Sequence, residues 1–209
     1  METWDIIDNE RAAFADLADS LTPAQWDQQS LCNKWKVRDV VAHVTEGSNL
    51  GGGKAVVTMV KYGFRLNTML EREAIKDGAA PPEELRKELR ETVGKRSTPP
   101  GVKAGGMLLD EVVHQQDVRR PLNIPRTVSP EALRAVLDEA VKQRTGLLPG
   151  KKRSAGITLR ATDIGWEHGD GPEVTGPGEA ILMAVAGRSA ALADLSGPGL
   201  GTLRERVSG

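Results

Sequence analysis

The chain has 209 residues, of which 39% are hydrophobic and 27% are charged. This balance is typical of one large globular domain or of a main domain with a small companion. The net charge of −1 gives no support to a nucleic-acid or membrane-surface partner, because both usually require a basic field. The sequence has one cysteine, no N-terminal leader pattern and no apolar run of about 18 residues. We therefore expect a cytoplasmic protein without a membrane-spanning segment.

Up to about residue 125, the sequence has the periodicity of packed helices. Apolar residues recur at i, i+3, i+4 and i+7, which is the spacing of a buried helical stripe. The first expected helix ends near Ser20, the second runs from Val37 to Gly47 and the third covers about 54–76. The fourth begins at Pro82, and the fifth covers about 102–119. An irregular stretch containing Trp26 and Trp35 is expected between the first two. Because most connections are short, an antiparallel bundle is the economical arrangement.

A different pattern follows residue 125. Ser129 as N-cap and Pro130 at the first helical position predict one more helix. A break is expected over 147–150, and the basic run 151–153 is expected to be a solvated loop. Side chains alternate between apolar and polar over 156–162, which predicts a strand.

The remaining residues complete a small α+β unit. Two short strands are expected at 166–168 and 173–175. A glycine turn between them places His168 at an exposed hairpin tip. An apolar helix is expected from about Glu179, with an interruption at Gly187.

The three histidines are the first candidates for chemistry. His43 lies about 60° from Val40, at the margin of the apolar stripe of its helix. Asp110, His114 and Asp117 fall within about 60° of one another on another helix. A carboxylate and an imidazole one turn apart, with an imidazole from a facing helix, could hold a divalent metal and leave a fourth position open. Glu111 lies about 60° to the other side of His114 and is a less natural partner. Such residues are also commonly solvated, and spacing alone favours that interpretation.

Cys32 is a further candidate. Because no basic partner is evident beyond Lys34 and Lys36, we expect a partly buried structural cysteine rather than a reactive thiol.

Residues 31–43, LCNKWKVRDVVAH, resemble the C-x-x-W-x-V-x-D-V-x-A-H segment of the mycothiol-dependent maleylpyruvate isomerase family. That family belongs to the wider DinB-like helical-bundle superfamily and is abundant in actinobacteria. Residues 110–122 resemble its second signature, an acid four residues before H-x-x-D followed by R-R-P-L. Residues 161–166 and 186–192 look like the family's small second domain, so the resemblance covers most of the chain.

The resemblance implies a mainly α fold. Residues 1–128 would form a DinB-like four-helix bundle that carries a divalent metal, commonly zinc. Residues 129–209 would form a small α+β C-terminal domain.

Carried over by position, the metal ligands would be His43, Asp110 and His114. The family's acid is often Glu, so Asp110 departs from the pattern by one methylene, and Glu111 could take its place from the neighbouring face.

Two catalytic roles are also implied. Asp117 could orient His114 or a bound water, or it could instead pair with Arg119 or Arg120 at the helix end. Arg188 matches an arginine of the family's second domain that could hold a substrate carboxylate, and a surface position is the alternative.

These expectations combine into a metal-dependent enzyme that uses a low-molecular-weight thiol, mycothiol where the host makes it. The metal would bind the thiol sulfur and lower its pKa, and the thiolate would add to a small electrophilic substrate. Expulsion of the thiol after bond rotation gives cis–trans isomerisation, and its retention gives S-transfer. We rank S-transfer, or another thiol-dependent reaction, above maleylpyruvate isomerisation itself. The alternative is a non-catalytic metal- or ligand-binding DinB-like protein. The oligomeric state is not predicted.

Overall fold

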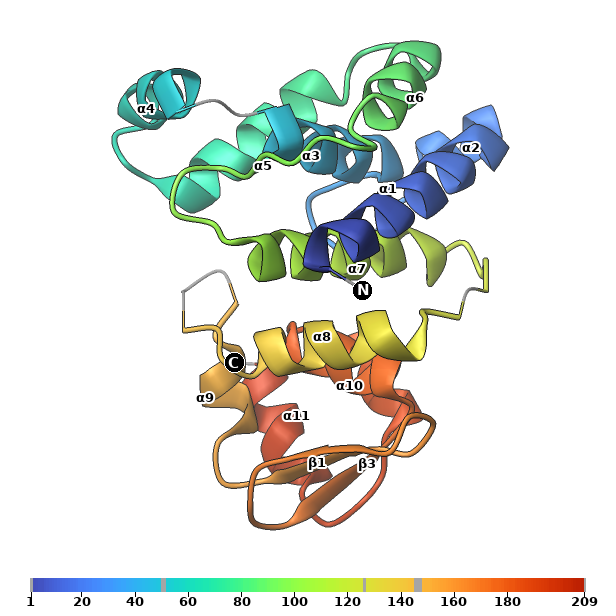
Figure 1. Ribbon diagram of the computed structural model, residues 1–209, viewed down its shortest axis with the longest axis vertical. Coiled ribbons are helices and arrows are strands. Elements are labelled where there is room, and N and C mark those ends of the chain that lie inside the picture. The colour runs from blue at the N-terminus through green and yellow to red at the C-terminus, as the bar shows by residue number, and fades with distance from the viewer. Residues whose placement is uncertain (1, 50–51, 126, 145–147, 209) are drawn as a thin grey trace. The chain divides into compact units, whose positions relative to one another are not determined.

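The computed structural model describes residues 2–49, 52–125, 127–144 and 148–208. Its backbone divides into two units, Met1–Pro125 and Arg126–Gly209, each with its own core (Figure 1). The predicted mainly α fold, a helical bundle followed by a small α+β part, is confirmed. The domain boundary expected after residue 128 stays a prediction. Among the described residues, no helix combines the length and apolar character that a bilayer span requires.

The first unit is helical in its described residues. Helix α1 packs against α6 and α7, and α3 packs against α5, α6 and α7. The seven helices are α1 Thr3–Ser20, α2 Pro23–Trp26, α3 Val37–Asn49, α4 Gly52–Lys61, α5 Leu66–Asp77, α6 Pro82–Arg90 and α7 Ala104–Arg119.

The apolar stripe of α3 forms the centre of this unit's core. Its valines are fully buried, because their spacing places them on the helix face that meets the neighbouring helices. The core consists largely of Phe14, Leu17, Trp26, Val37, Val40, Val41, Val44, Leu85, Leu89 and Val118.

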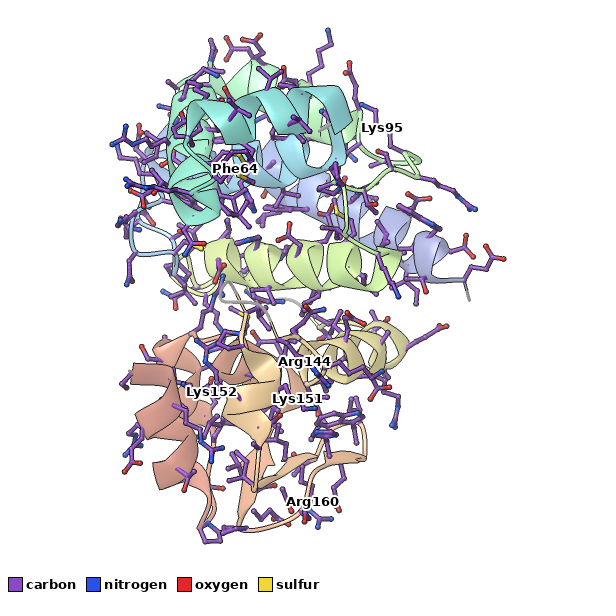
Figure 2. The ribbon with its side chains drawn as sticks, turned by 90° about the vertical axis from the view of Figure 1, so that its left-hand side faces the viewer. Phe64, Lys95, Arg144, Lys151, Lys152 and Arg160 are labelled. Atoms are coloured by element: carbon purple, nitrogen blue, oxygen red, sulfur yellow. The ribbon has the colours of Figure 1, made fainter. Side chains whose placement is uncertain are left out.

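Two details of the first unit differ from the sequence prediction. Trp26 ends the short helix α2 instead of lying in an irregular stretch, and Thr22 caps that helix through its side chain. The single helix expected over 54–76 is two helices, because Gly63 and Phe64 have φ values of 58° and 61°. Two successive residues in the left-handed region cannot continue a right-handed helix. Phe64 is 74% exposed at this turn (Figure 2).

The second unit is a three-stranded sheet with helices, in the strand order β2-β1-β3. Strand β1 pairs antiparallel with β2 and parallel with β3, and α10 contacts α8, β1 and β3. The elements are α8 Pro130–Ala140, α9 Gly150–Ser154, β1 Thr158–Ala161, β2 Trp166–His168, β3 Glu173–Gly176, α10 Gly178–Val185, the 3₁₀ helix η1 Ser189–Asp194 and α11 Leu200–Ser208.

The predicted pairing of the second and third strands is wrong. His168 lies opposite Leu159 of β1, stacks against Trp166 with ring centroids 6.0 Å apart, and is exposed, but it is not at a hairpin tip. The tight antiparallel connection is between β1 and β2. The chain then crosses to the other side of β1 before β3, because alternation identifies strands without specifying their partners.

The basic run 151–153 lies in helix α9 rather than in a loop. Lys151 and Lys152 are nevertheless exposed (Figure 2). The N-cap at Ser129 is confirmed, since its side chain accepts a hydrogen bond from the Ala132 amide. Of the break expected over 147–150, residue 147 lies outside the described residues.

A fully buried ion pair joins α1 to α7. The Nε of Arg11 donates to Glu111 Oε1 at 2.8 Å, and both side chains have no exposed surface. The remaining guanidinium nitrogens donate to Thr92 O, Lys95 O and Ser48 Oγ. Burial raises the pKa of Glu111 to about 7, although the charge and hydrogen bond of Arg11 oppose this. Arg11 therefore connects three separate segments to α7.

Replacing Arg11 by methionine should leave a carboxyl group buried without its partner. We expect Arg11→Met to lower the free energy of unfolding by about 3–5 kcal/mol, measured by urea denaturation. The double variant Arg11→Met/Glu111→Leu should recover a large part of this loss, because it removes the uncompensated group. Equal instability of the single and double variants would contradict this account.

A second network joins the end of α4 to α5. The Glu73 carboxylate accepts hydrogen bonds from Tyr62 Oη at 2.6 Å, Lys61 Nζ at 2.9 Å and Lys76 Nζ at 3.1 Å. The Tyr62 hydrogen bond, followed by those of the two lysines, overcomes desolvation and lowers the pKa of Glu73 from 4.5 to about 2.

Because the folded-state pKa of Glu73 is lowered, its contribution to stability is complete above pH 4.5 and is lost as the pH falls towards 2. We expect Glu73→Gln to destabilise the protein at pH 7, and the difference from the wild type to narrow below pH 4.5. Urea unfolding at pH 7, 4 and 3 checks this. A difference that stays constant with pH would exclude the carboxylate charge as the cause.

Candidate metal centre

Helices α3 and α7 bring three predicted metal ligands together. His114 Nε2 lies 3.4 Å from Asp110 Oδ1, and His43 Nε2 lies 3.8 Å from the same oxygen. The three donor atoms all lie within 4.8 Å of one another. In a tetrahedral zinc site, nitrogen and oxygen ligands about 2.1 Å from the metal are about 3.4 Å apart. The donor set therefore fits a divalent metal with only small side-chain movements.

The electrostatics of these groups also suit a cation. Burial raises the pKa of Asp110, but the charge of His114 and hydrogen bonds from both histidines hold it well below its ordinary value. Burial lowers the pKa of His114, but Asp110 and Asp117 raise it well above its ordinary value. An ionised carboxylate thus attracts positive charge to the position between the two imidazoles.

Glu111, the alternative acidic ligand, takes another direction from α7. Its carboxylate is fully buried against Arg11, whereas Asp110 is partly exposed and faces the two histidines. Since the two carboxylates are about 100° apart around the helix, they cannot serve the same side. The geometry favours Asp110 as the acidic ligand.

Asp117 lies one turn beyond His114 and is completely buried. Its Oδ2 is 2.9 Å from His114 Nδ1, which leaves Nε2 of the same ring on the side of Asp110. A carboxylate on the second ring nitrogen fixes the tautomer and orientation of a metal-binding histidine. The alternative for Asp117 was a pairing with Arg119 or Arg120 at the end of the helix. Arg119 donates through Nε to Gln115 Oε1 at 3.0 Å.

Two residues beside this cluster have no role in the sequence-based site. The Trp35 ring lies 4.7 Å from the His43 ring and 5.8 Å from the His114 ring, measured between centroids. Cys32 Sγ lies 3.1 Å from Asp117 Oδ2 and 3.8 Å from His114 Nδ1. Both residues belong to the C-x-x-W segment, and this motif is the sequence signal from which their position beside the candidate metal ligands could have been predicted.

Arg188 belongs to the second unit. It immediately precedes η1, is partly buried, and donates through Nη1 to the carbonyl oxygen of Ala186 at 2.8 Å. Its role in binding a substrate carboxylate stays a prediction.

The comparisons with known proteins agree with this architecture. Residues 7–99 match the family model of the mycothiol maleylpyruvate isomerase N-terminal domain, a span that includes His43 and ends before Asp110. Crystal structures of the mycothiol-dependent maleylpyruvate isomerase and of a histidine-to-alanine mutant of it each match with a TM-score of 0.59 at 11% identity. Each match covers 94% of this chain and 91% of the other. No curated protein matches the sequence.

At 11% identity the structural likeness shows the fold alone, and the family model matches 93 of the 209 residues, all of them in the helical unit. The matched span begins in α1, includes α3 and continues beyond α6. Residues 7–99 are therefore similar to the N-terminal domain of the mycothiol maleylpyruvate isomerase family, as the sequence resemblance predicted.

Proposed function

We propose that this protein is a thiol-dependent enzyme that works at a divalent metal held by His43, Asp110 and His114. The observation that carries the proposal is the convergence of two imidazoles and one carboxylate, all within 4.8 Å, on facing helices. Three protein ligands leave a coordination position for another molecule, which is the usual arrangement of a catalytic zinc site. Zinc suits this mixed nitrogen and oxygen set, and mycothiol is the thiol that the family's name suggests.

When bound, such a metal supplies Lewis acidity that lowers the pKa of a coordinated thiol at neutral pH. The chain's own residues prepare the site. Asp110 provides the negative charge, and Asp117 holds His114 through Nδ1 so that Nε2 faces Asp110. Trp35 packs against both imidazole rings and thereby restricts their rotation.

The substrate class is a small electrophile with a carbon that accepts a thiol. Addition of the thiolate forms a carbon–sulfur bond while the substrate's C=C π bond opens and its electron pair moves onto the conjugated carbonyl group. If rotation follows and the same thiolate leaves, the π bond forms again and the product is the geometric isomer. If the thiol stays, the neighbouring carbon takes up the proton that the thiol lost, the product is a thioether and the enzyme is an S-transferase. In this proposal Arg188 binds a carboxylate of the substrate, because a guanidinium can donate two parallel hydrogen bonds to it. A cytoplasmic location is part of the proposal.

Metal content is the direct test of the ligand set. We expect about one zinc or another divalent ion per chain in wild-type protein purified without a metal-affinity tag, and a large loss in His114→Ala, because two remaining ligands bind zinc weakly. Plasma mass spectrometry measures both. His168→Ala is the matched control, since His168 is an exposed histidine of the second unit, and it should retain the metal. A wild type that binds no metal, even after zinc is added, would contradict the proposal.

Turnover of the zinc-loaded protein tests the reaction. With mycothiol and an electrophilic α,β-unsaturated acid, we expect Asp110→Asn to lower kcat/KM at least about 100-fold, because the ligand charge is lost. Asp110→Glu should retain most activity, and Glu111→Gln, the matched control on the neighbouring face, should change it less than about tenfold. Consumption of free mycothiol would indicate S-transfer, and isomerisation of the substrate without consumption of mycothiol would indicate an isomerase. Metal-loaded wild type without turnover on either assay would favour the non-catalytic metal- or ligand-binding alternative.

A further inference from the structure

The turn that precedes α3 is attached directly to α7. The amide of Leu31 donates to the carbonyl oxygen of Asp117 at 3.0 Å. The amide of Trp35 donates to the carbonyl oxygen of Cys32 at 2.9 Å, and Gln29 Nε2 donates to that same oxygen at 2.7 Å. Ser30 Oγ accepts from the Cys32 amide at 3.1 Å. The backbone of Cys32 is therefore held on both sides, and its side chain has a defined position against α7.

The Cys32 thiol contacts the Asp117 carboxylate, which in turn contacts His114. Sγ donates to Asp117 Oδ2 at 3.1 Å, and the same oxygen lies 2.9 Å from His114 Nδ1. Asp117 has no exposed surface, whereas Cys32 is half-buried. A buried carboxylate that lacks one of its donors can rotate towards another, and its hold on the imidazole then changes.

We propose that Cys32 is a positioning residue of the metal centre, the outermost member of a chain of contacts from its thiol through Asp117 to His114. The thiol donates to Oδ2, which fixes the carboxylate plane. The carboxylate fixes the Nδ1–H tautomer of His114 and directs Nε2 towards Asp110. This inference rests on the proposed function for its consequence for metal binding, while the contacts themselves join protein groups only.

This role separates Cys32 from two other uses of a thiol at the same place. A packing role needs only the volume of the side chain, so valine would serve better than serine. A ligand role needs the sulfur itself, and the atoms make this worth testing, because Cys32, His114 and Asp117 also lie within 4.8 Å of one another. A positioning role needs the donor, so serine should serve and valine should not.

The test compares Cys32→Ser, Cys32→Val and Cys32→Ala in the full chain. Zinc affinity is measured by competition between the metal-free protein and a chromogenic chelator. We expect Cys32→Val and Cys32→Ala to weaken zinc binding about tenfold, the low end of the range for outer partners of metal ligands. Cys32→Ser should stay within about threefold of the wild type. Thermal unfolding of each variant is recorded beside the affinity, so that general loss of structure is separated from loss of the contact.

A double-mutant cycle tests whether the thiol acts through Asp117. In the Asp117→Asn background, Cys32→Ala should weaken zinc binding no further, because its acceptor has already changed. Additive losses would overturn the proposal. Equal affinity of Cys32→Ala and the wild type, or better retention by Val than by Ser, would also overturn it.

Two further measurements distinguish this proposal from its neighbours. In cobalt-substituted protein, a sulfur-to-metal charge-transfer band that disappears in both Cys32→Ser and Cys32→Ala would show direct ligation and overturn the positioning role. In the metal-free protein, nitrogen NMR of His114 should show an ordered, hydrogen-bonded Nδ1–H in wild type and Cys32→Ser, and a weakened Nδ1–H hydrogen bond in Cys32→Val. If the wild type binds no metal, the proposed function fails, but this NMR comparison still supports or overturns the contact chain.

Discussion

The burial of helix α7 on almost every side is the constraint on which the first unit depends. Eleven of its residues are buried, and several of these are polar. A buried polar group generally needs a partner inside the protein, and three of these side chains bind neighbouring segments. Glu111 meets α1 through Arg11, Gln115 Nε2 meets the Glu10 carbonyl, and Asp117 meets the turn at Cys32. The face of α7 that carries the proposed metal ligands is less buried, since Asp110 is partly exposed there.

Much of the fold was predictable because it depends on local chemistry. Helical periodicity identified the long helices, and a Ser-Pro pair identified the start of α8. The break between α4 and α5 was not predictable, because a single glycine often continues a helix and the positive φ of Phe64 has no sequence signal. The order of the strands was not predictable either, because alternation reports which side of a strand is buried and not which strand lies beside it.

The site divides in the same way. Asp110, His114 and Asp117 could be grouped from sequence because one helix turn separates neighbours. Grouping them with His43 depends on the packing of α3 on α7. Spacing alone did not favour a shared metal site, whereas the family resemblance implied one. Cys32 was interpreted as structural because its basic neighbours in sequence are lysines. Its partner in space is a carboxylate 85 positions away, and no local pattern reports such a contact.

The contacts around the proposed metal site join residues that are far apart in the sequence, and this affects when the site forms during folding. Arg11 and Glu111 are 100 positions apart, and Cys32 and Asp117 are 85 apart, so these contacts close only when most of the first unit has folded. Long loops are costly to close before the core can reward them. The proposed metal ligands lie on helices that pack around an apolar core. The proposed metal centre would thus be pre-organised: the entropy of ordering its ligands is lost during folding, and little remains to be lost when the metal binds.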